Sequence, residues 1–213
     1  MGMSARPALH LTPSDPDPEI PETPEDQRTL IVADRFRDVM QALGLDLGDP
    51  NLVGTPLRVA RSYRELFAGL DPAREPELRT FPNAEGYSQI VSVTDIRFHS
   101  VCAHHFLPFF GTAHLAYLPK DRVVGLSKLA RIVEHYARRP QIQERLTEQV
   151  IDFLEHRLRP AGAMVVIQAR HMCMEMRGVG QPGATTRTSA WRGAFADART
   201  RQEFLDLLPT SAP

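Results

Sequence analysis

Apolar residues recur along this chain with two different periods, and each period indicates a different kind of element. Spacings of three and four, as in an amphipathic helix, run through residues 126–138 and 142–158. Four short stretches are instead rich in β-branched and aromatic residues, which is typical of strands, at residues 89–101, 111–119, 163–174 and 185–196. The predicted order is therefore strand, strand, helix, helix, strand, strand.

Helix start and stop signals define a separate helical section nearer the N-terminus. Thr23 is followed by a proline and two acids, so it can cap a helix that Gly44 would end. Thr55 is also followed by a proline, and it opens a second helix that extends to Gly69. We therefore expect a helical section over residues 23–70.

The strands and helices that follow predict one α+β domain over residues 88–208, because helices gathered on one face of an antiparallel sheet define that class. The domain should end in a short helix that begins at Thr200, since Thr200 and Glu203 fit a capping box. A four-stranded sheet leaves two edges, which favour pairing with neighbouring subunits. Residues 1–22 are rich in proline and acids, and they predict a disordered tail.

Composition limits the classes of function. The formal net charge of −1 argues against a nucleic-acid-binding protein, although arginines gather locally in the C-terminal half and suggest a small anionic ligand. No apolar run resembles a signal peptide or approaches the roughly 18 residues of a membrane span, so we expect a cytoplasmic protein. Two cysteines are too few for a disulfide scaffold, and a reducing compartment favours free or metal-bound thiols.

The sequence CAHH at residues 102–105 places a thiol and two imidazoles close together. The spacing of Cys102 and His105 lets a turn present both side chains to one metal ion, and Cys173 can supply a second sulfur. Strand geometry would instead put His104 on the face of Cys102, so spacing alone does not choose between the two histidines. Three nitrogen and sulfur ligands predict a zinc ion with an open fourth position.

Two other residues are candidates for chemistry beside such an ion. His171 precedes Cys173 by two positions, so the two side chains share a face if the strand continues through both. A buried histidine with satisfied hydrogen bonds is the alternative for His171. Glu144 begins the second helix, where an acid favours the helix dipole, and a carboxylate can also accept two N–H bonds from a guanine.

The start of the first helix of the α+β domain has the properties of an anion site. Ser127 can cap this helix, whose free N–H groups and dipole attract an anion. Lys128 and Arg131 add positive charge at the same end, where the dipole alone would favour acids. A phosphate would neutralise both, whereas the alternative is a solvated basic helix face.

Together these segments resemble type I GTP cyclohydrolase over approximately residues 24 to 208. The resemblance rests on motifs that occur in the same order along the chain: T-P-x-R at residues 55–58, C-x-H-H-x-x-P-F at 102–109, G-L-S-K-x-x-R at 125–131, Q-x-Q-E-R-L-T at 141–147 and H-x-C-M-x-x-R-G-V at 171–179. Several ordered motifs of this length are highly specific.

The resemblance implies a role for each candidate residue. The implied zinc ligands are Cys102, His105 and Cys173, and the implied acid–base residues are His104 and His171. The implied triphosphate ligands are Ser127, Lys128, Arg131 and Arg177, with Arg58 entering from a neighbouring subunit, and the implied purine-binding residues are Gln143 and Glu144. The family has the T-fold and forms a decamer of two pentameric rings, with active sites between subunits.

The implied reaction converts GTP to 7,8-dihydroneopterin triphosphate with release of formate, the first step of tetrahydrofolate and pterin biosynthesis. Ala103 departs from the family pattern, which usually has C-E-H-H at this point. We expect a tolerated change, with Glu175 supplying the missing acid; the alternative is an enzyme arrested after the imidazole ring opens. A further alternative is a zinc-containing T-fold assembly that binds purines or pterins without turnover.

Overall fold

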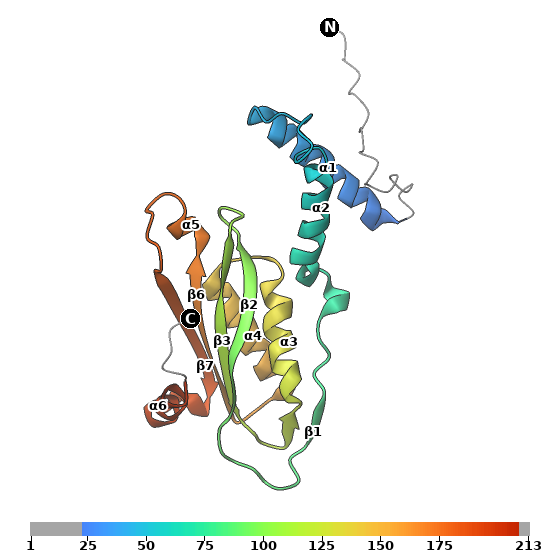
Figure 1. Ribbon diagram of the computed structural model, residues 1–213. Coiled ribbons are helices and arrows are strands. Elements are labelled where there is room, and N and C mark those ends of the chain that lie inside the picture. Colours follow the sequence, from blue (N-terminus) through green and yellow to red (C-terminus); the bar gives the residue numbers. More distant parts are fainter. Residues whose placement is uncertain (1–22, 209–213) are drawn as a thin grey trace. The chain divides into compact units, whose positions relative to one another are not determined.

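The computed structural model describes residues 23–208, and its contacts divide them into two compact units (Figure 1). We call residues 23–65 the N-terminal unit and residues 66–208 the C-terminal unit. The predicted disordered tail, residues 1–22, lies outside the described residues. Within the described range, no helix combines the length and the apolar character that crossing a membrane requires.

Both helices of the N-terminal unit begin where the sequence predicts. Helix α1 spans Pro24–Ala42, and the Thr23 hydroxyl caps it by accepting a hydrogen bond from a backbone N–H in the first turn. Gly44 follows the helix with a positive φ of 76°, as its predicted role in ending the helix requires. Helix α2 spans Thr55–Leu66, so it ends three residues before the predicted Gly69.

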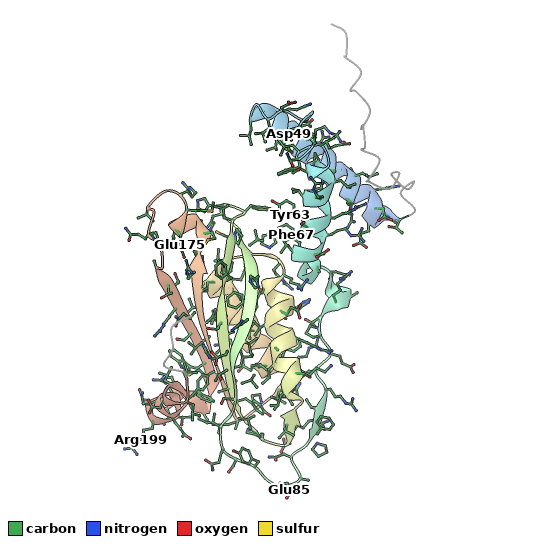
Figure 2. All side chains as sticks on the ribbon, in the orientation of Figure 1. Asp49, Tyr63, Phe67, Glu85, Glu175 and Arg199 are labelled. Carbon is green, nitrogen blue, oxygen red and sulfur yellow. The ribbon has the colours of Figure 1, made fainter. Side chains whose placement is uncertain are left out.

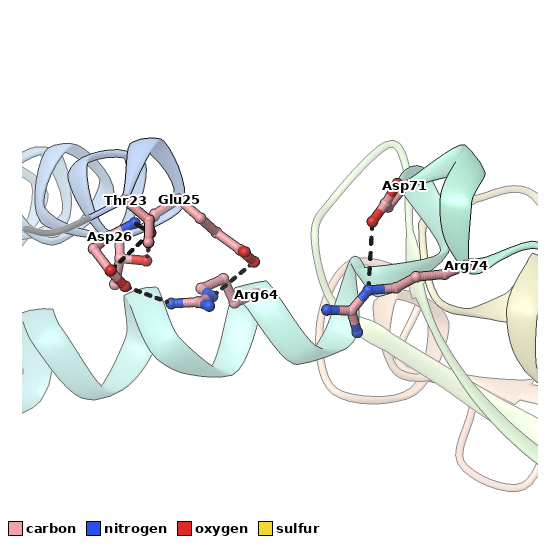
Figure 3. A network of polar contacts seen from close by, with 7 residues as sticks. Thr23, Glu25, Asp26, Arg64, Asp71 and Arg74 are labelled. Atoms are coloured by element: carbon pink, nitrogen blue, oxygen red, sulfur yellow. Dashed lines mark hydrogen bonds and ion pairs between the residues drawn. The ribbon is translucent and has the colours of Figure 1, made fainter.

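Charged side chains join the two helices of this unit. Arg64 of α2 contacts Glu25 at 3.0 Å and Asp26 at 3.1 Å, both in the first turn of α1 (Figure 3). All three side chains are substantially exposed, so solvent screening leaves these pairs a small contribution to stability.

The C-terminal unit is built on a five-stranded sheet. In spatial order its strands are β5 (Pro140–Gln141), β2 (Val91–Cys102), β3 (Pro108–Leu118), β6 (Gly162–His171) and β7 (Thr185–Gly193). The four long strands pair antiparallel, which confirms the predicted antiparallel sheet. The two-residue β5 runs parallel to the end of β2 and was not predicted. The α+β class is therefore confirmed.

Two helices pack on one face of this sheet and close the core (Figure 1). Helix α3 spans Leu126–Ala137 and α4 spans Gln143–Leu158, close to the predicted ranges. Their apolar stripes meet the inward side chains of the strands, as the three-and-four spacing indicates. Fully buried members of this core include Leu129, Ile132, Leu146, Ile151, Leu154, Leu115, Val165 and Ile167.

The remaining elements are short. They are η1 (Ala68–Leu70), η2 (Pro72–Arg74), β1 (Thr80–Pro82), β4 (Arg122–Val124), α5 (Met172–Glu175), η3 (Ala194–Ala196) and α6 (Ala198–Asp206). The predicted start of the last helix at Thr200 is wrong, because Asp197 caps α6 by accepting a hydrogen bond from the Thr200 N–H. The predicted strand 163–174 also ends early, since α5 follows His171 directly.

The other face of the sheet carries a cavity of about 1320 Å³. Helix α6 covers one end of this face, where Phe204 packs on Phe195 and on residues of β3 and β6. The cavity lining is mixed, with Arg97 and Arg187 at the two ends of one row of paired residues across the sheet. This face therefore combines apolar and cationic groups instead of forming a second dry core.

Candidate active site

The candidates for metal binding, proton transfer and purine binding lie at one end of the sheet, where strands β2 and β6 end and helix α4 begins. The α3 candidates lie toward the opposite end, because the N–H of Val124, just before α3, donates to the hydroxyl of Tyr117, which pairs with the first residue of β2. Cys102 is the last residue of β2, and it pairs with Gln141 of β5. His171 is the last residue of β6, and it pairs with Phe109 near the start of β3. Helix α4 begins two residues after Gln141, at Gln143. Strand pairing thus brings segments far apart in the sequence to one end of the sheet (Figure 1).

The connection after β2 is a tight turn held by backbone hydrogen bonds. The N–H of Phe106 donates to the Cys102 carbonyl at 2.9 Å, and the N–H of Cys102 donates to the Leu107 carbonyl at 2.8 Å. The N–H of Ala103 donates to the Gln141 carbonyl at 2.8 Å. Spacing alone did not choose between His104 and His105 as the neighbour of Cys102. The turn brings His105 to Cys102, with 3.9 Å between Nδ1 of His105 and Sγ of Cys102.

Cys173 completes a group of three potential metal ligands. The ligand atoms of Cys102, His105 and Cys173 all lie within 4.8 Å of one another. The expectation that Cys173 shares a strand face with His171 is wrong, since the helical turn α5 carries Cys173. The helical turn α5 nevertheless brings the Cys173 sulfur close to the ligand atoms of Cys102 and His105. Sequence spacing cannot reveal a turn of four residues, which has no measurable period.

The donor set fits a transition-metal ion of the zinc type. In tetrahedral coordination, zinc bonds of about 2.3 Å to sulfur and 2.0 Å to nitrogen place the ligand atoms about 3.5–3.8 Å apart. The Cys102–His105 separation of 3.9 Å is close to this range. Burial, reinforced by the adjacent Cys102, raises the pKa of the Cys173 thiol. A bound cation would favour the thiolate forms and oppose this effect.

His171 is held on its face and on its edge. Its ring stacks on Phe109 with a centroid distance of 4.7 Å and an interplanar angle of 2°. Its Nε2 lies 2.8 Å from Oε1 of Gln143. Burial lowers the pKa of His171 below its usual value, and the Glu144 carboxylate opposes that shift. A half-buried histidine with one fixed edge is suited to handling a proton at its other nitrogen.

His104 lies outside the group of three ligands. It is exposed in the turn after β2, and its ring meets the His105 ring edge to face at 6.3 Å. His105 is also exposed, but only His105 contacts Cys102, so the two adjacent histidines have different neighbours.

The first turn of α3 carries the cationic candidates, but its cap differs from the prediction. Gly125 occupies the N-cap position, and no side chain caps the helix, so the expectation that Ser127 caps it is wrong. Ser127 is exposed one turn from Arg131, on the same side of the helix. Lys128 lies between them in sequence and is partly buried.

The purine candidates Gln143 and Glu144 have opposite surroundings although they are adjacent. Gln143 is 2% exposed, and its amide is engaged inside the protein. Glu144 is exposed at the start of α4 and is close enough to His171 to affect its pKa. Only Glu144 thus presents its side chain to solvent beside the site.

The two remaining arginine candidates lie in different units. Arg177 is exposed just after α5, and its charge acts on the Cys173 thiol, whose pKa is raised mainly by burial and lowered slightly by Arg177. Arg58 belongs to α2, where it donates hydrogen bonds to the Asn51 carbonyl at 3.1 Å and to the Thr55 hydroxyl at 3.2 Å. The role of Arg58 toward a neighbouring subunit stays a prediction.

Glu175, the acid expected to compensate for Ala103, is bound by an arginine. Its carboxylate accepts two hydrogen bonds from Arg170, at 2.8 Å and 2.5 Å, and Glu175 lies on α5 (Figure 2). This bidentate pairing lowers the pKa of Glu175. The carboxylate therefore carries its negative charge two residues from Cys173, but that charge is already paired with Arg170.

Sequence reasoning missed the partners that hold the site together. Phe109 supports the ring of His171, and Gln141 anchors the turn that carries the two adjacent histidines. Both lie inside the motifs that carry the resemblance. The sequence signal for such partners was a pair of glutamines, Gln141 and Gln143, between apolar segments. A polar side chain that is buried must find hydrogen-bond partners inside the protein.

The chain is similar to known proteins over most of its length. The GTP cyclohydrolase I family matches residues 32–209. GTP cyclohydrolase 1 of Thermobifida fusca is 51% identical over 175 residues, which cover 81% of this chain and 84% of that protein. GTP cyclohydrolase 1 of Bacillus pumilus is 47% identical over 180 residues, which cover 84% of this chain and 95% of that protein.

Among solved structures, the archaeosine synthase QueF-like in the apo form resembles half of this chain with a TM-score of 0.40 and 18% identity, covering 95% of its own length. A likeness of that size carries no conclusion about this protein. The family match spans most of the chain, and the identity to the two curated relatives is about one half. The chain therefore belongs to the GTP cyclohydrolase I family of enzymes.

Proposed function

We propose that this protein converts GTP and water to 7,8-dihydroneopterin triphosphate and formate. The observation that carries the proposal is the group formed by Cys102, His105 and Cys173 beside His171, in a chain of the GTP cyclohydrolase I family. Water adds at C8 of the purine, the imidazole ring opens to a formamide, and a second water hydrolyses the formamide so that C8 leaves as formate. The ribose then rearranges and closes onto the resulting diamine, with loss of water, to form the pterin.

Zinc is the metal we propose for the three-ligand group. Two sulfur atoms and one imidazole nitrogen are ligands that zinc accepts readily, and three protein ligands leave a fourth position open. When bound, zinc supplies Lewis-acid activation of water near neutral pH. The chain holds the three ligands on a strand end, a tight turn and a helical turn, which keeps them within 4.8 Å of one another.

The two histidines that are not metal ligands handle protons. Because Nε2 of His171 faces Gln143, its Nδ1 is the nitrogen from which a proton reaches the purine imidazole as that ring opens. His104 lies exposed in the turn next to His105, where it exchanges protons with substrate and solvent. The support for this assignment is that the His104 ring meets the ring of His105 and His171 precedes Cys173 by two residues, whereas neither histidine belongs to the three-ligand group.

Cationic and acidic side chains recognise the substrate, and those on α3 would come from a neighbouring subunit, because α3 begins at the end of the sheet opposite Cys102. Ser127, Lys128 and Arg131 on α3, together with Arg177, bind the triphosphate, and Glu144 accepts hydrogen bonds from the amino edge of guanine. The triphosphate takes no part in bond breaking, so its binding energy serves to hold the purine at the metal. Arg58 would complete the phosphate site from a neighbouring subunit.

We further propose that the subunits assemble through their sheets as a T-fold decamer of two pentameric rings. The outer strands β2 and β7 leave backbone groups available over most of their length, and edges of this kind favour pairing with another copy. The sheet face that lacks α3 and α4 would then face the interior of a closed barrel. A decamer is expected in solution by light scattering; a monomer at micromolar concentration would contradict this assembly.

Ala103 gives a specific reason to consider a second outcome, in which the enzyme stops after opening the imidazole ring. Loss of the acid usual at this position removes a negative charge from the site, and Glu175 already pairs with Arg170. A non-catalytic assembly that binds purines or pterins is less well supported, because two acid–base histidines beside an open metal position have no role in binding alone.

Turnover of GTP is the first prediction. The purified protein should release formate from GTP and form the pterin chromophore, and removal of zinc with a chelator should abolish both products. Adding zinc back should restore them. Formate without the chromophore would indicate the arrested reaction, and the absence of both products from the zinc-loaded protein would refute the proposed enzyme.

Metal content gives the second prediction, with adjacent histidines as a matched pair. The wild-type protein should bind about one zinc ion per chain. His105→Ala should lose most of this zinc because it removes one of three ligands, whereas His104→Ala should retain it. Inductively coupled plasma mass spectrometry on dialysed protein measures both. Equal zinc loss in the two variants would contradict the ligand assignment.

The third prediction concerns the departure at position 103. Ala103→Glu should change kcat by less than about threefold, because backbone hydrogen bonds to Gln141 and Leu107 set the shape of the turn without help from this side chain. Steady-state formate release with GTP measures the effect. A tenfold gain in pterin formation in the variant would show that the native alanine limits the reaction.

A further inference from the structure

Gln143 is a buried amide in contact with a proposed catalytic histidine, and its hydrogen bonds point into the protein. We propose that Gln143 is a positioning residue that holds His171 in one ring orientation and one tautomer, and that it does not contact the purine. The inference rests on the proposed function, in which His171 transfers a proton. It assigns to Gln143 a different role from that of its neighbour Glu144.

The orientation of the Gln143 amide follows from its partners. Its nitrogen lies 3.1 Å from the Ile167 carbonyl, 3.0 Å from the Thr186 carbonyl and 3.1 Å from the Thr188 hydroxyl. Carbonyl oxygens can only accept hydrogen bonds, so the atom that faces them must be the NH₂ group. The other amide atom, which faces His171, is therefore the oxygen.

This orientation decides which nitrogen of His171 carries hydrogen in the neutral ring. The amide oxygen of Gln143 can only accept, and it lies 2.8 Å from Nε2 of His171. Nε2 must therefore donate, which leaves Nδ1 as the unprotonated nitrogen of the neutral imidazole. A proton taken up at Nδ1 is then the one that can be delivered to a substrate. In the reverse tautomer, an unprotonated Nε2 of His171 would face the amide oxygen of Gln143, and neither atom could donate a hydrogen bond.

Phe109 restrains the same ring from a second direction. The two rings are parallel within 2°, with centroids 4.7 Å apart, and Phe109 is fully buried. Phe109 also lies directly opposite His171 in the pairing of β3 with β6. One face of the imidazole and one of its edges are thus fixed by the protein, and the remaining nitrogen keeps a defined direction.

Gln143 is itself held rigidly. Thr147, one turn later on α4, donates to the Gln143 carbonyl at 2.8 Å, and its hydroxyl lies 2.7 Å from that of Thr188. These contacts connect α4 to β7 as well as to β6. A side chain that is 2% exposed and bonded on both ends of its amide has no free group to offer a purine.

The decisive experiment compares two substitutions of Gln143 that disturb the fold similarly. Gln143→Met removes the acceptor for His171, whereas Gln143→Glu keeps an oxygen there, and a buried glutamic acid can still donate one O–H bond. We expect Gln143→Met to lower kcat for formate release about 10–100-fold with KM for GTP changed less than about twofold. Gln143→Glu should recover much of that loss.

Glu144→Gln serves as the matched control on the adjacent residue. It replaces a proposed purine contact, so KM should rise by about tenfold or more. Zinc content should stay at the wild-type level in all three variants, because none of them replaces a metal ligand. A rise in KM for Gln143→Met with unchanged kcat would show that Gln143 binds the purine and would overturn the inference. Equal activity of the Met and Glu variants would reduce Gln143 to a structural role.

Two further measurements cover misfolding and loss of turnover. If Gln143→Met does not fold, Thr188→Val removes one partner of the amide and should lower kcat about two- to fivefold at constant KM. Nitrogen-15 NMR spectra of the zinc-loaded, histidine-labelled protein should show His171 protonated at Nε2 and unprotonated at Nδ1. This measurement does not require turnover. The opposite tautomer would refute the inference, whereas failure of the wild-type protein to release formate would refute only the proposed function.

Discussion

Polar groups at the end of the sheet that carries Cys102 and His171 must find partners inside the protein, because burial there removes water as an alternative. Two glutamines, Gln141 on β5 and Gln143 at the start of α4, meet this requirement. Gln141 is fully buried; its amide nitrogen donates to the Tyr136 carbonyl at 2.9 Å and to Gln149 at 2.7 Å. Its backbone carbonyl accepts from the turn that follows β2. The metal-ligand turn, the helix and the strand ends are therefore fixed by one set of internal hydrogen bonds.

This set of hydrogen bonds explains why the sequence predicted the fold better than the details of the site. Burial of apolar faces determines the order of long strands and helices, and it leaves a period in the sequence that can be read directly. The partner of a buried amide leaves no such period. Gln143 could be recognised as a motif residue, but its contact with His171 depends on a strand that begins nearly twenty residues later in the chain.

The short elements were missed for a related reason. A helical turn of four residues, such as α5, and a two-residue strand, such as β5, contain too few positions to show any period. Both lie at the site and both change its geometry: α5 carries Cys173, and β5 aligns Gln141 with Cys102. The ligand set was nevertheless implied by the family resemblance, whereas spacing alone did not choose between His104 and His105 until the turn placed His105 near Cys102.

The site divides into a rigid part and an exposed part, and this division matches the two tasks of the proposed reaction. Proton transfer and metal binding require fixed geometry. Cys102 and His171 stand on strand ends, and backbone hydrogen bonds hold the turn that carries the exposed His104 and His105. The proposed phosphate ligands Ser127, Arg131 and Arg177 are exposed. Arg177 begins a segment in which Gly178, Gly180 and Gly183 all adopt positive φ. Binding of a charged group tolerates such a segment, because the energy of Coulombic attraction changes slowly with distance. The energy of a hydrogen bond to a reacting atom changes steeply with distance and angle.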